Sequence, residues 1–261
     1  MRCEKIMSIL KEQVPESFAE EWDNVGLLAG DPGKDVRKIL VALDASDRVI
    51  DQAEALGADM LITHHPLIFS PVKKITADDF IGRRICRLIR GDIAYYAMHT
   101  NYDMVRMADE AAKRLDLKEP QILESVCTTG GTEYGFGKTG KLKEPMTLSA
   151  YAEQVRELFG LPGIAVYGDP DRIVKMAAVC PGSGKSFLSS AVSSKADVYI
   201  TGDVDYHFGT DANARGIAVM DAGHYGIEHI FIEDMCRLLK QLLDEEVQVF
   251  AMPVEHPYVV I

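Results

Sequence analysis

The segment ADMLITHH, residues 58–65, is a short apolar run that ends in two adjacent histidines, His64 and His65. A run of this length that passes at once into polar residues is typical of a strand buried inside a parallel sheet. A related string, ADVYIT at residues 196–201, follows 138 residues later. The chain therefore repeats one kind of buried strand, and the first copy leads directly into histidines.

Two further pairs of apolar runs are similar, each at a fixed sequence offset. The run that begins at residue 39 aligns with residue 177 at the same offset, and IAYY at residues 93–96 aligns with IAVM at residues 217–220 at an offset of 124. The repetition predicts two related α/β lobes whose strand ends converge. The alternative is that unrelated α/β units share such short strings by chance.

Apolar runs alternate with segments of helical periodicity along the whole chain. The predicted strands are residues 39–43, 60–63, 93–98, 134–137, 164–167, 173–179, 198–201, 217–220 and 247–250. The predicted helices are residues 2–13, 47–56, 77–90, 105–115, 148–159, 186–194, 205–214 and 227–243. This alternation predicts an α/β fold with mainly parallel strands, whose loops at the carboxyl ends hold the ligands.

The turn sequence TTGG at residues 128–131 is the predicted boundary between the lobes. It divides the chain into a first lobe, residues 1–127, and a second lobe, residues 128–261, whose C-terminal segment could cross back to the first. Because the turn is short and not of low complexity, we expect a packed interface between the lobes instead of a flexible linker.

Composition excludes several classes of protein. Of 261 residues, 47% are apolar and 26% are charged, as in ordinary globular proteins, and the formal net charge is −12. Such a charge repels polyanions, which argues against stable nucleic-acid binding and against anionic membranes. A small phosphate-bearing substrate remains compatible with a local positive site.

The cysteines indicate a reducing compartment. Five are scattered along the chain without a CxxC pair, as expected for free thiols and not for a disulfide framework or a thiolate zinc site. No signal-peptide core and no membrane-length apolar run is visible. The predicted location is the cytoplasm.

Side chains that bind metals follow three of the apolar runs. Imidazoles and carboxylates without a nearby thiolate suit divalent Zn, Mn, Fe or Ni. His224 and Glu228 are spaced i, i+4, which places them on one face of a helix. Five ligands are too many for one ion that keeps open positions, but they suit two ions about 3.5–4 Å apart. The candidate metal ligands are His64, His65, Asp103, His224 and Glu228.

Two more histidines are candidates for catalysis. His99, together with Asn101, flanks Asp103 and could orient ligands or hold the substrate. His207 follows the strand that repeats the His64 strand, so it could carry protons or touch the substrate, or be an ordinary surface histidine of a helix. The remaining two, His229 and His256, have no such context and are predicted to be structural.

The segment CPGSGKS, residues 180–186, resembles a nucleotide-binding loop but lacks the first glycine of the Walker motif. Its glycine-rich turn, Gly182, Ser183 and Gly184, could hold an anion on backbone amides with help from Lys185. The alternative is a simple tight turn. Cys180 has no neighbouring base that would make it a nucleophile.

Taken together and in order, five motifs resemble the Nif3-like family, also called GTP cyclohydrolase I type 2 homologs. They are EWDNVGL at 21–27, ITHHPL at 62–67, HTNYD at 99–103, TGD at 201–203 and GHYGIEH at 223–229. The resemblance covers nearly the whole chain. One departure is that the family often has Glu and a His pair after Thr-Gly, where this chain has Asp203 and Tyr206-His207.

The resemblance implies a dinuclear metal centre, and by motif position its ligands fall on the same five residues. It also implies two intertwined α/β lobes without the inserted domain of longer members, and a ring-shaped homohexamer. The implied activity is GTP cyclohydrolase-like hydrolysis, in which metal-activated water attacks C8 of guanine. The alternative function is a non-catalytic metal chaperone or insertase, or a metal-binding regulator. A third possibility is that the metals only lock the lobes together.

Overall fold

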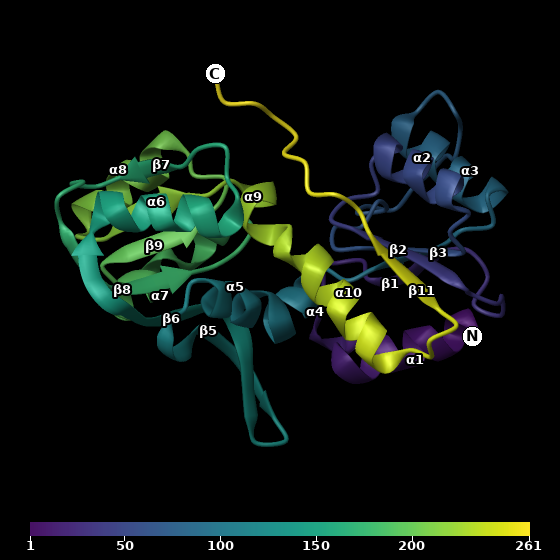
Figure 1. Cartoon of the computed structure of the whole chain (residues 1–261), viewed down its shortest axis with the longest axis horizontal. Helices are drawn as coiled ribbons and strands as arrows, with labels where there is room; N and C mark the ends of the chain where they lie inside the picture. The colour runs from purple at the N-terminus through teal and green to yellow at the C-terminus, as the bar shows by residue number, and fades with distance from the viewer. The chain divides into compact units, whose positions relative to one another are not determined.

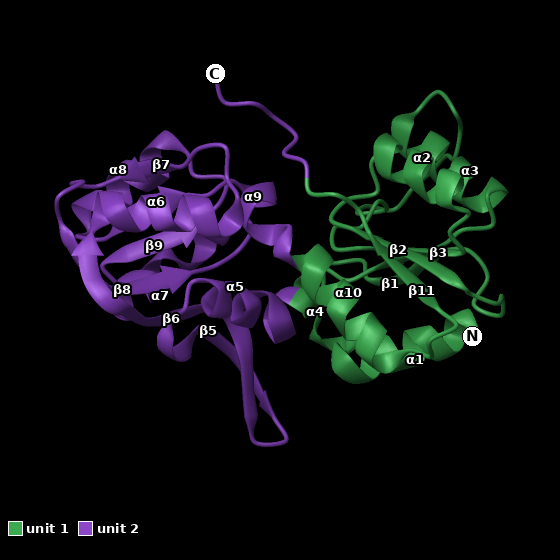
Figure 2. Ribbon diagram, viewed as in Figure 1, with its two compact units in different colours: residues 1–102, 231–254 green, residues 103–230, 255–261 purple.

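The computed structural model describes residues 1–261, which divide into two compact units (Figure 2). Unit 1 consists of residues 1–102 and 231–254, and unit 2 consists of residues 103–230 and 255–261. Each unit is built on its own β-sheet with helices packed against it (Figure 1). The predicted α/β fold is confirmed.

The sheet of unit 1 has five strands in the order β1-β4-β3-β2-β11. They are β1 Gly26–Ala29, β2 Lys38–Ala42, β3 Met60–Thr63, β4 Ala94–Ala97 and β11 Gln248–Ala251. All neighbours are parallel except β1, which pairs antiparallel with β4 at the edge. The carboxyl ends of β2, β3 and β4 therefore meet at one border of the sheet.

Helices cover both faces of this sheet (Figure 1). On one face, Ile50 and Leu88 pack with Leu61 and Tyr95 in a buried apolar cluster. Ser46 caps the first of these helices by accepting a hydrogen bond from Val49 N. The helical segments of unit 1 are α1 Cys3–Gln13, η1 Glu16–Phe18, α2 Asp47–Leu56, α3 Phe80–Arg90, α4 Thr100–Tyr102 and α10 Ile230–Leu242.

The sheet of unit 2 has six strands in the order β5-β6-β8-β9-β10-β7. The middle strands β8, β9 and β10 are parallel, and β5, β6 and β7 are antiparallel to their neighbours. The strands are β5 Lys118–Thr129, β6 Thr132–Thr147, β7 Ala165–Tyr167, β8 Ile173–Val179, β9 Val198–Thr201 and β10 Ala218–Asp221.

Unit 2 begins with a single π-helical turn, η2 Asp103–Met107, that continues into α5 Ala108–Arg114. Ala191 and Ala212, on two helices of this unit, pack with Tyr199 and Val219 of the sheet in an apolar cluster. The other helical segments are α6 Leu148–Phe159, η3 Gly184–Phe187, α7 Leu188–Ser193, α8 Tyr206–Ala214 and α9 His224–Glu228.

The two sheets share the same core arrangement, as the sequence repeat predicts. The order β1-β4-β3-β2 of unit 1 corresponds to β7-β10-β9-β8 of unit 2. The carboxylate of Asp59 accepts two backbone N–H bonds at the start of β2, at 2.8 and 2.9 Å. Asp197 makes the same contacts with β8, at 2.8 and 3.0 Å. The two units are therefore related in their hydrogen bonding as well as in their strand order.

The predicted boundary after residue 127 does not coincide with a division of the structure. Residues 118–141 form one hairpin with the TTGG turn at its tip (Figure 1). Because paired strands of a hairpin are hydrogen-bonded along their length, the turn cannot separate two compact units. The chain enters unit 2 at Asp103, and residues 231–254 belong to unit 1, where β11 pairs with β2.

Two strands, β1 and β5, are absent from the sequence prediction. β1 is only four residues long and begins with a glycine. β5 is largely exposed and polar, so it lacks the apolar run by which buried strands are found. None of the helices in the chain combines the length and the apolar character that crossing a membrane requires.

Candidate metal centre

Three histidines gather at the carboxyl ends of two neighbouring strands of unit 1. His64 and His65 follow β3 directly, and His99 follows β4, which pairs with β3 in parallel. One nitrogen from each ring can be chosen so that all three lie within 4.8 Å of one another. His64 is fully buried. We call these three residues the histidine cluster.

Each ring of the cluster is held through Nδ1. His64 Nδ1 lies 2.8 Å from the carbonyl oxygen of Met98, His65 Nδ1 lies 2.7 Å from Asp44 Oδ1, and His99 Nδ1 lies 2.9 Å from Asp23 Oδ1. A carbonyl or a carboxylate can only accept, so Nδ1 carries the proton in each pair. In the neutral ring Nε2 then holds the lone pair, which is the arrangement of histidines that bind metals.

Asp23 is itself held in its ionised form. Burial alone raises the pKa of its carboxyl, but hydrogen bonds from His99 and Thr100 outweigh burial and lower the pKa to about 2. Thr100 donates twice, through its backbone N–H at 3.0 Å and its hydroxyl at 2.6 Å. A fixed negative charge therefore lies behind the His99 ring at neutral pH.

In unit 2, His224 and Glu228 lie one turn apart on α9, with His224 Nε2 3.0 Å from Glu228 Oε2. With metal–ligand bonds of about 2.0–2.2 Å, two atoms bound to one ion lie at most about 4.4 Å apart, so these two atoms are close enough to share an ion. His224 Nδ1 lies 2.7 Å from Asp203 Oδ2, so this ring is held in the same way as those of unit 1. Asp203 adopts the left-handed backbone conformation, with φ 57°, in which Asp, Asn and His are enriched among residues other than glycine.

Gly182 makes room for the carboxylate of Glu228. A Cβ at this position would lie 2.2 Å from Glu228 Oε1, and the backbone φ of +73° also favours glycine. Glu228 is only 3% exposed, so its carboxylate has little space to move away. The glycine predicted to hold an anion therefore contacts a buried acidic side chain.

Asp103 and Glu228 act on one thiol of unit 2. Burial, together with the negative charges of Asp103 and Glu228, raises the pKa of Cys180 to about 12. A raised pKa disfavours the thiolate, which is the nucleophilic form of cysteine, and this agrees with the lack of a neighbouring base in the sequence. A carboxylate oxygen of Asp103 and one of Glu228 can be chosen within 4.8 Å of each other, so these two candidate ligands are close together in unit 2.

Comparison with known proteins identifies the family. The family model described as Duf34/NIF3 (NGG1p interacting factor 3) matches residues 1–257. The chain belongs to this NIF3 family. A relative from Clostridium perfringens, named GTP cyclohydrolase 1 type 2 homolog, is 34% identical over 250 residues, 95% of each chain.

Solved structures of NIF3-related proteins agree with this assignment. A Bacillus cereus protein related to NIF3 has a TM-score of 0.95 at 26% identity, covering 100% of this chain and 99% of that one. The Staphylococcus aureus hypothetical protein SA1388 has a TM-score of 0.92 at 30% identity, with the same coverage. The whole chain therefore has the fold of the NIF3 family.

The donor set of this NIF3-family chain fits divalent metal ions. It consists of imidazole nitrogens and carboxylate oxygens without a thiolate, and the space that Gly182 leaves for Glu228 keeps that carboxylate beside His224. Within each unit the structure brings the predicted ligands together: His64 and His65 in unit 1, and Asp103, His224 and Glu228 in unit 2.

Of the remaining candidates, only His99 joins a cluster. Asn101 is buried, accepts a hydrogen bond from His99 N at 3.0 Å and donates to Val14 O at 3.4 Å, so it shapes the loop that carries His99. His207 is exposed on α8 beside Tyr206. Its role in catalysis stays a prediction.

The anion-binding turn also stays a prediction. The amide of Gly184 donates to Thr201 Oγ1 at 2.9 Å, so it already has a partner. Ser183 is exposed, and Lys185 Nζ pairs with Asp205 at 2.9 Å. An incoming phosphate would have to compete with both contacts.

The three carboxylates that contact the candidate histidines were not predicted from the sequence: Asp23, Asp44 and Asp203. A signal was available, because a metal-binding histidine usually donates its second ring N–H to a carboxylate or carbonyl. Asp44 follows the strand next to His65, and Asp203 follows the strand next to His224. Searching neighbouring strand ends for acids would have found both.

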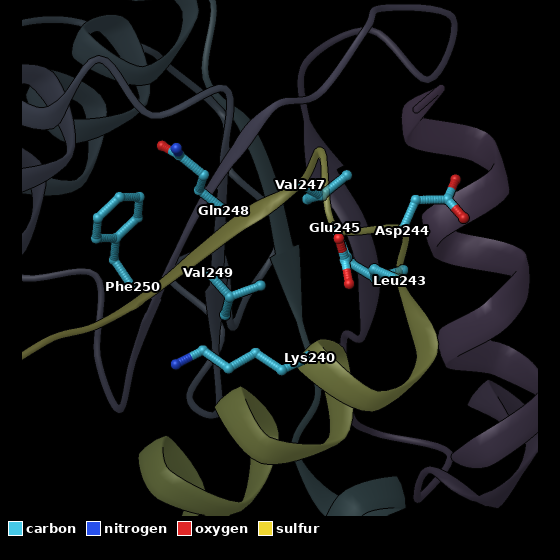
Figure 3. A pocket seen from close by; sticks show the side chains of 8 residues that line it. All are labelled: Lys240, Leu243, Asp244, Glu245, Val247, Gln248, Val249 and Phe250. Carbon is cyan, nitrogen blue, oxygen red and sulfur yellow. The ribbon is translucent and has the colours of Figure 1, made fainter.

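A separate cavity of about 470 Å³ lies in unit 1 along β11 (Figure 3). Its lining comes from the end of α10, the following turn and β11, and Lys240 and Phe250 are among the side chains that border it. It shares no residue with the histidine cluster. Lys240 is the one basic side chain among its lining residues, so the cavity is poorly suited to a polyphosphate.

Proposed function

We propose that this protein binds a pair of divalent metal ions and uses them to hydrolyse a small substrate, as the name of its GTP cyclohydrolase 1 type 2 homologs suggests. The proposed ligands are His64, His65, Asp103, His224 and Glu228. One observation carries the proposal: four histidines, three in unit 1 and one in unit 2, each have Nδ1 fixed by an oxygen at 2.7–2.9 Å.

Fixing four imidazoles in this way is entropically unfavourable and is expected only where their Nε2 atoms have a function. Ordering four imidazoles with the same tautomer removes rotamer freedom and commits four acceptors to them, namely the Met98 carbonyl, the buried Asp23 carboxylate and the half-exposed carboxylates of Asp44 and Asp203. Metal binding explains the orientation of His64, His65 and His224, because each of these rings then presents a lone pair to an ion, and in His99 the same lone pair is available to take up a proton. Bound divalent ions supply positive charge that lowers the pKa of water and polarises the bond to be cleaved.

His99 is the proposed proton carrier of the reaction. Asp23 holds its Nδ1 proton, and the fixed negative charge of that carboxylate stabilises the ring when Nε2 takes up a second proton. The ring can therefore accept a proton from water and deliver it to the leaving nitrogen. Asn101 keeps the His99 backbone in place during this exchange.

Reconstitution of metal-stripped protein tests the proposal. Titration with Zn, Mn, Fe or Ni should show two ions per chain, and the loaded protein should turn over GTP or another nucleotide. His99→Gln should retain both ions and lose most of the turnover. If His207 and Lys185 touch the substrate, His207→Ala and Lys185→Ala should also reduce turnover. Failure to retain any ion would refute the metal proposal.

A metal carrier is the second candidate, and side-chain exposure favours it. The side chains of His65 and His224 are 25% and 34% exposed, so ligand exchange at these positions is open to solvent. A carrier should pass its ions rapidly to a competing chelator and hydrolyse no nucleotide. Slow release combined with turnover would decide for the enzyme.

A further inference from the structure

Two large aromatic side chains of unit 1 remain exposed beside the histidine cluster. Trp22 is 57% exposed and Phe69 is 52% exposed, and their ring centroids are 5.8 Å apart. Both contact His99, whose ring centroid lies 6.0 Å from Trp22 and 6.3 Å from Phe69. We call Trp22 and Phe69 the aromatic pair.

The exposure of the aromatic pair is built into the loops that carry it. Asn24 Nδ2 donates to Ile68 O at 2.6 Å, which ties the loop of Trp22 to the loop of Phe69. On either side of Trp22, Glu20 N donates to Thr100 Oγ1 and Asp23 accepts from Thr100. The loop is therefore fixed at three points, although more than half of the Trp22 surface faces solvent.

The neighbouring histidine cluster indicates which kind of ligand would cover the rings of Trp22 and Phe69. His99 belongs both to the cluster and to the contacts of the aromatic pair, and its ring centroid is 5.3 Å from that of His64. A flat group stacked on Trp22 is therefore placed next to the imidazole that the proposed reaction uses. Phe80, which is equally exposed at 52%, lies instead under the guanidinium of Arg84.

We propose that Trp22 and Phe69 form a stacking site for a planar heteroaromatic ring of the substrate, positioned beside His99. This inference rests on the proposed function, because it assigns the class of substrate that the metal centre acts on. Stacking suits such a ring, since every nucleobase presents a π-face to an aromatic side chain. The site selects for ring shape, and phosphate groups play no part in this contact.

Intrinsic fluorescence tests the site directly, because Trp22 is the single tryptophan of the chain. Metal-free protein is titrated with guanosine, adenosine and cytidine, and with ribose 5-phosphate as the probe that lacks a ring. At least one nucleoside should quench the emission with saturation, and ribose 5-phosphate should not. Phe69→Ala should weaken that binding by roughly 5- to 150-fold, the range for loss of one stacked ring.

Matched variants separate stacking from general damage. Phe69→Tyr keeps a ring and should bind within a few-fold of the unaltered protein, and Phe80→Ala removes an equally exposed ring elsewhere in unit 1 and should have no effect. Calorimetry replaces fluorescence for Trp22→Ala, which should lose binding, and for Trp22→Phe, which should retain most of it.

Three results would overturn the stacking site. They are no quenching by any nucleoside, equal binding by Phe69→Ala, or an emission change that follows protein concentration alone, which would assign the aromatic pair to contact with a second copy of the chain. Metal uptake after reconstitution is measured separately in every variant. Normal metal uptake without nucleoside binding rejects the stacking site and leaves the metal proposal intact, whereas an unaltered protein that takes up no metal rejects the proposed function.

Discussion

Units 1 and 2 build the same pair of side chains from different strands. In unit 1, Asp44 follows β2 and holds His65, which follows the neighbouring strand β3. In unit 2, Asp203 follows β9 and holds His224, which follows the neighbouring strand β10. Both pairs have a distance of 2.7 Å and a sequence separation of 21 residues. Because β2 and β3 correspond to β8 and β9, the acid–histidine pair of unit 2 lies one strand further along its sheet than the pair of unit 1.

The difference shows that parallel strand ends, and not particular positions, define the site. Any two adjacent parallel strands end close enough for an acid on one to reach a histidine on the other. What distinguishes the units is charge: the cluster of unit 1 consists of imidazoles, whereas unit 2 adds the carboxylates of Asp103 and Glu228. We therefore expect unit 2 to contribute most of the attraction for cations.

The largest effect should come from Glu228→Gln, which removes a buried charge but preserves shape. Metal affinity should fall at least about 100-fold, because unpairing one member of a buried charged contact costs about 3–5 kcal/mol. Elemental analysis after gel filtration measures the loss. The metal-free variant should be as stable as the unaltered protein or more so, since an amide is cheaper to bury.

His256→Ala is the control for this variant, because His256 Nε2 contacts the carbonyl of Gly160 and not a candidate ligand. It should keep its metal. Equal metal content in Glu228→Gln and the unaltered protein would exclude Glu228 as a ligand and remove the charge difference between the units.

Gly182→Ala should destabilise unit 2 by about 3 kcal/mol, combining backbone strain at φ +73° with a contact 2.2 Å from Glu228 Oε1. Denaturant unfolding of metal-free protein measures this loss. Gly160→Ala is the matched control, because φ is +62° there but no atom lies within 4 Å of the added Cβ. Its cost should be about 1 kcal/mol. Equal costs would mean that Gly182 does not shape the carboxylate site.

Asp44→Asn and Asp203→Asn test whether the two acid–histidine pairs are equivalent. Each should reduce metal affinity about 10- to 100-fold, the usual cost of removing the partner of a metal-binding histidine. Metal titrations of both single variants and the double variant give the coupling between them. A loss confined to one variant would break the correspondence between the units.

The smallest effect concerns pH and Asp23, a carboxylate of unit 1 without a counterpart in unit 2. Its pKa of about 2 lies below the ordinary 3.8, so its contribution is present above about pH 4 and is lost as the pH falls towards 2. Asp23→Asn should reduce the free energy of unfolding by about 2 kcal/mol at pH 6. The two proteins should converge near pH 2, and a constant difference at all pH values would contradict this account.

Most of the fold could be predicted because buried parallel strands leave a strong mark in the sequence. Each of β3, β8 and β9 was predicted with the bounds that the structure has. The hairpin of β5 and β6 could not, since its solvated outer strand needs no apolar pattern. Its TTGG turn has the composition of a linker, and only the pairing of distant residues reveals it as a hairpin tip.

Part of the candidate site could likewise be predicted from the sequence, and part could not. His64, His65 and His224 are visible because they follow apolar runs, but Asp23 lies in a loop before an edge strand and is brought to His99 across 76 residues. Gly182 was noticed for an anion, and only coordinates show that it faces Glu228. Site residues that directly follow one strand can be recognised in the sequence, whereas contacts between residues from distant segments of the chain cannot.

The discontinuity of unit 1 has a consequence for biosynthesis. The segment that supplies β11 and the end of α10 leaves the ribosome after all of residues 103–230, so unit 2 has its full sheet while β2 still lacks its neighbour. At usual rates of translation this interval is on the order of ten seconds. During it the apolar strand β2 is an open edge that can pair with another nascent chain. Completion of unit 1, and with it protection from aggregation, therefore depends on a segment that is translated only after all of residues 103–230.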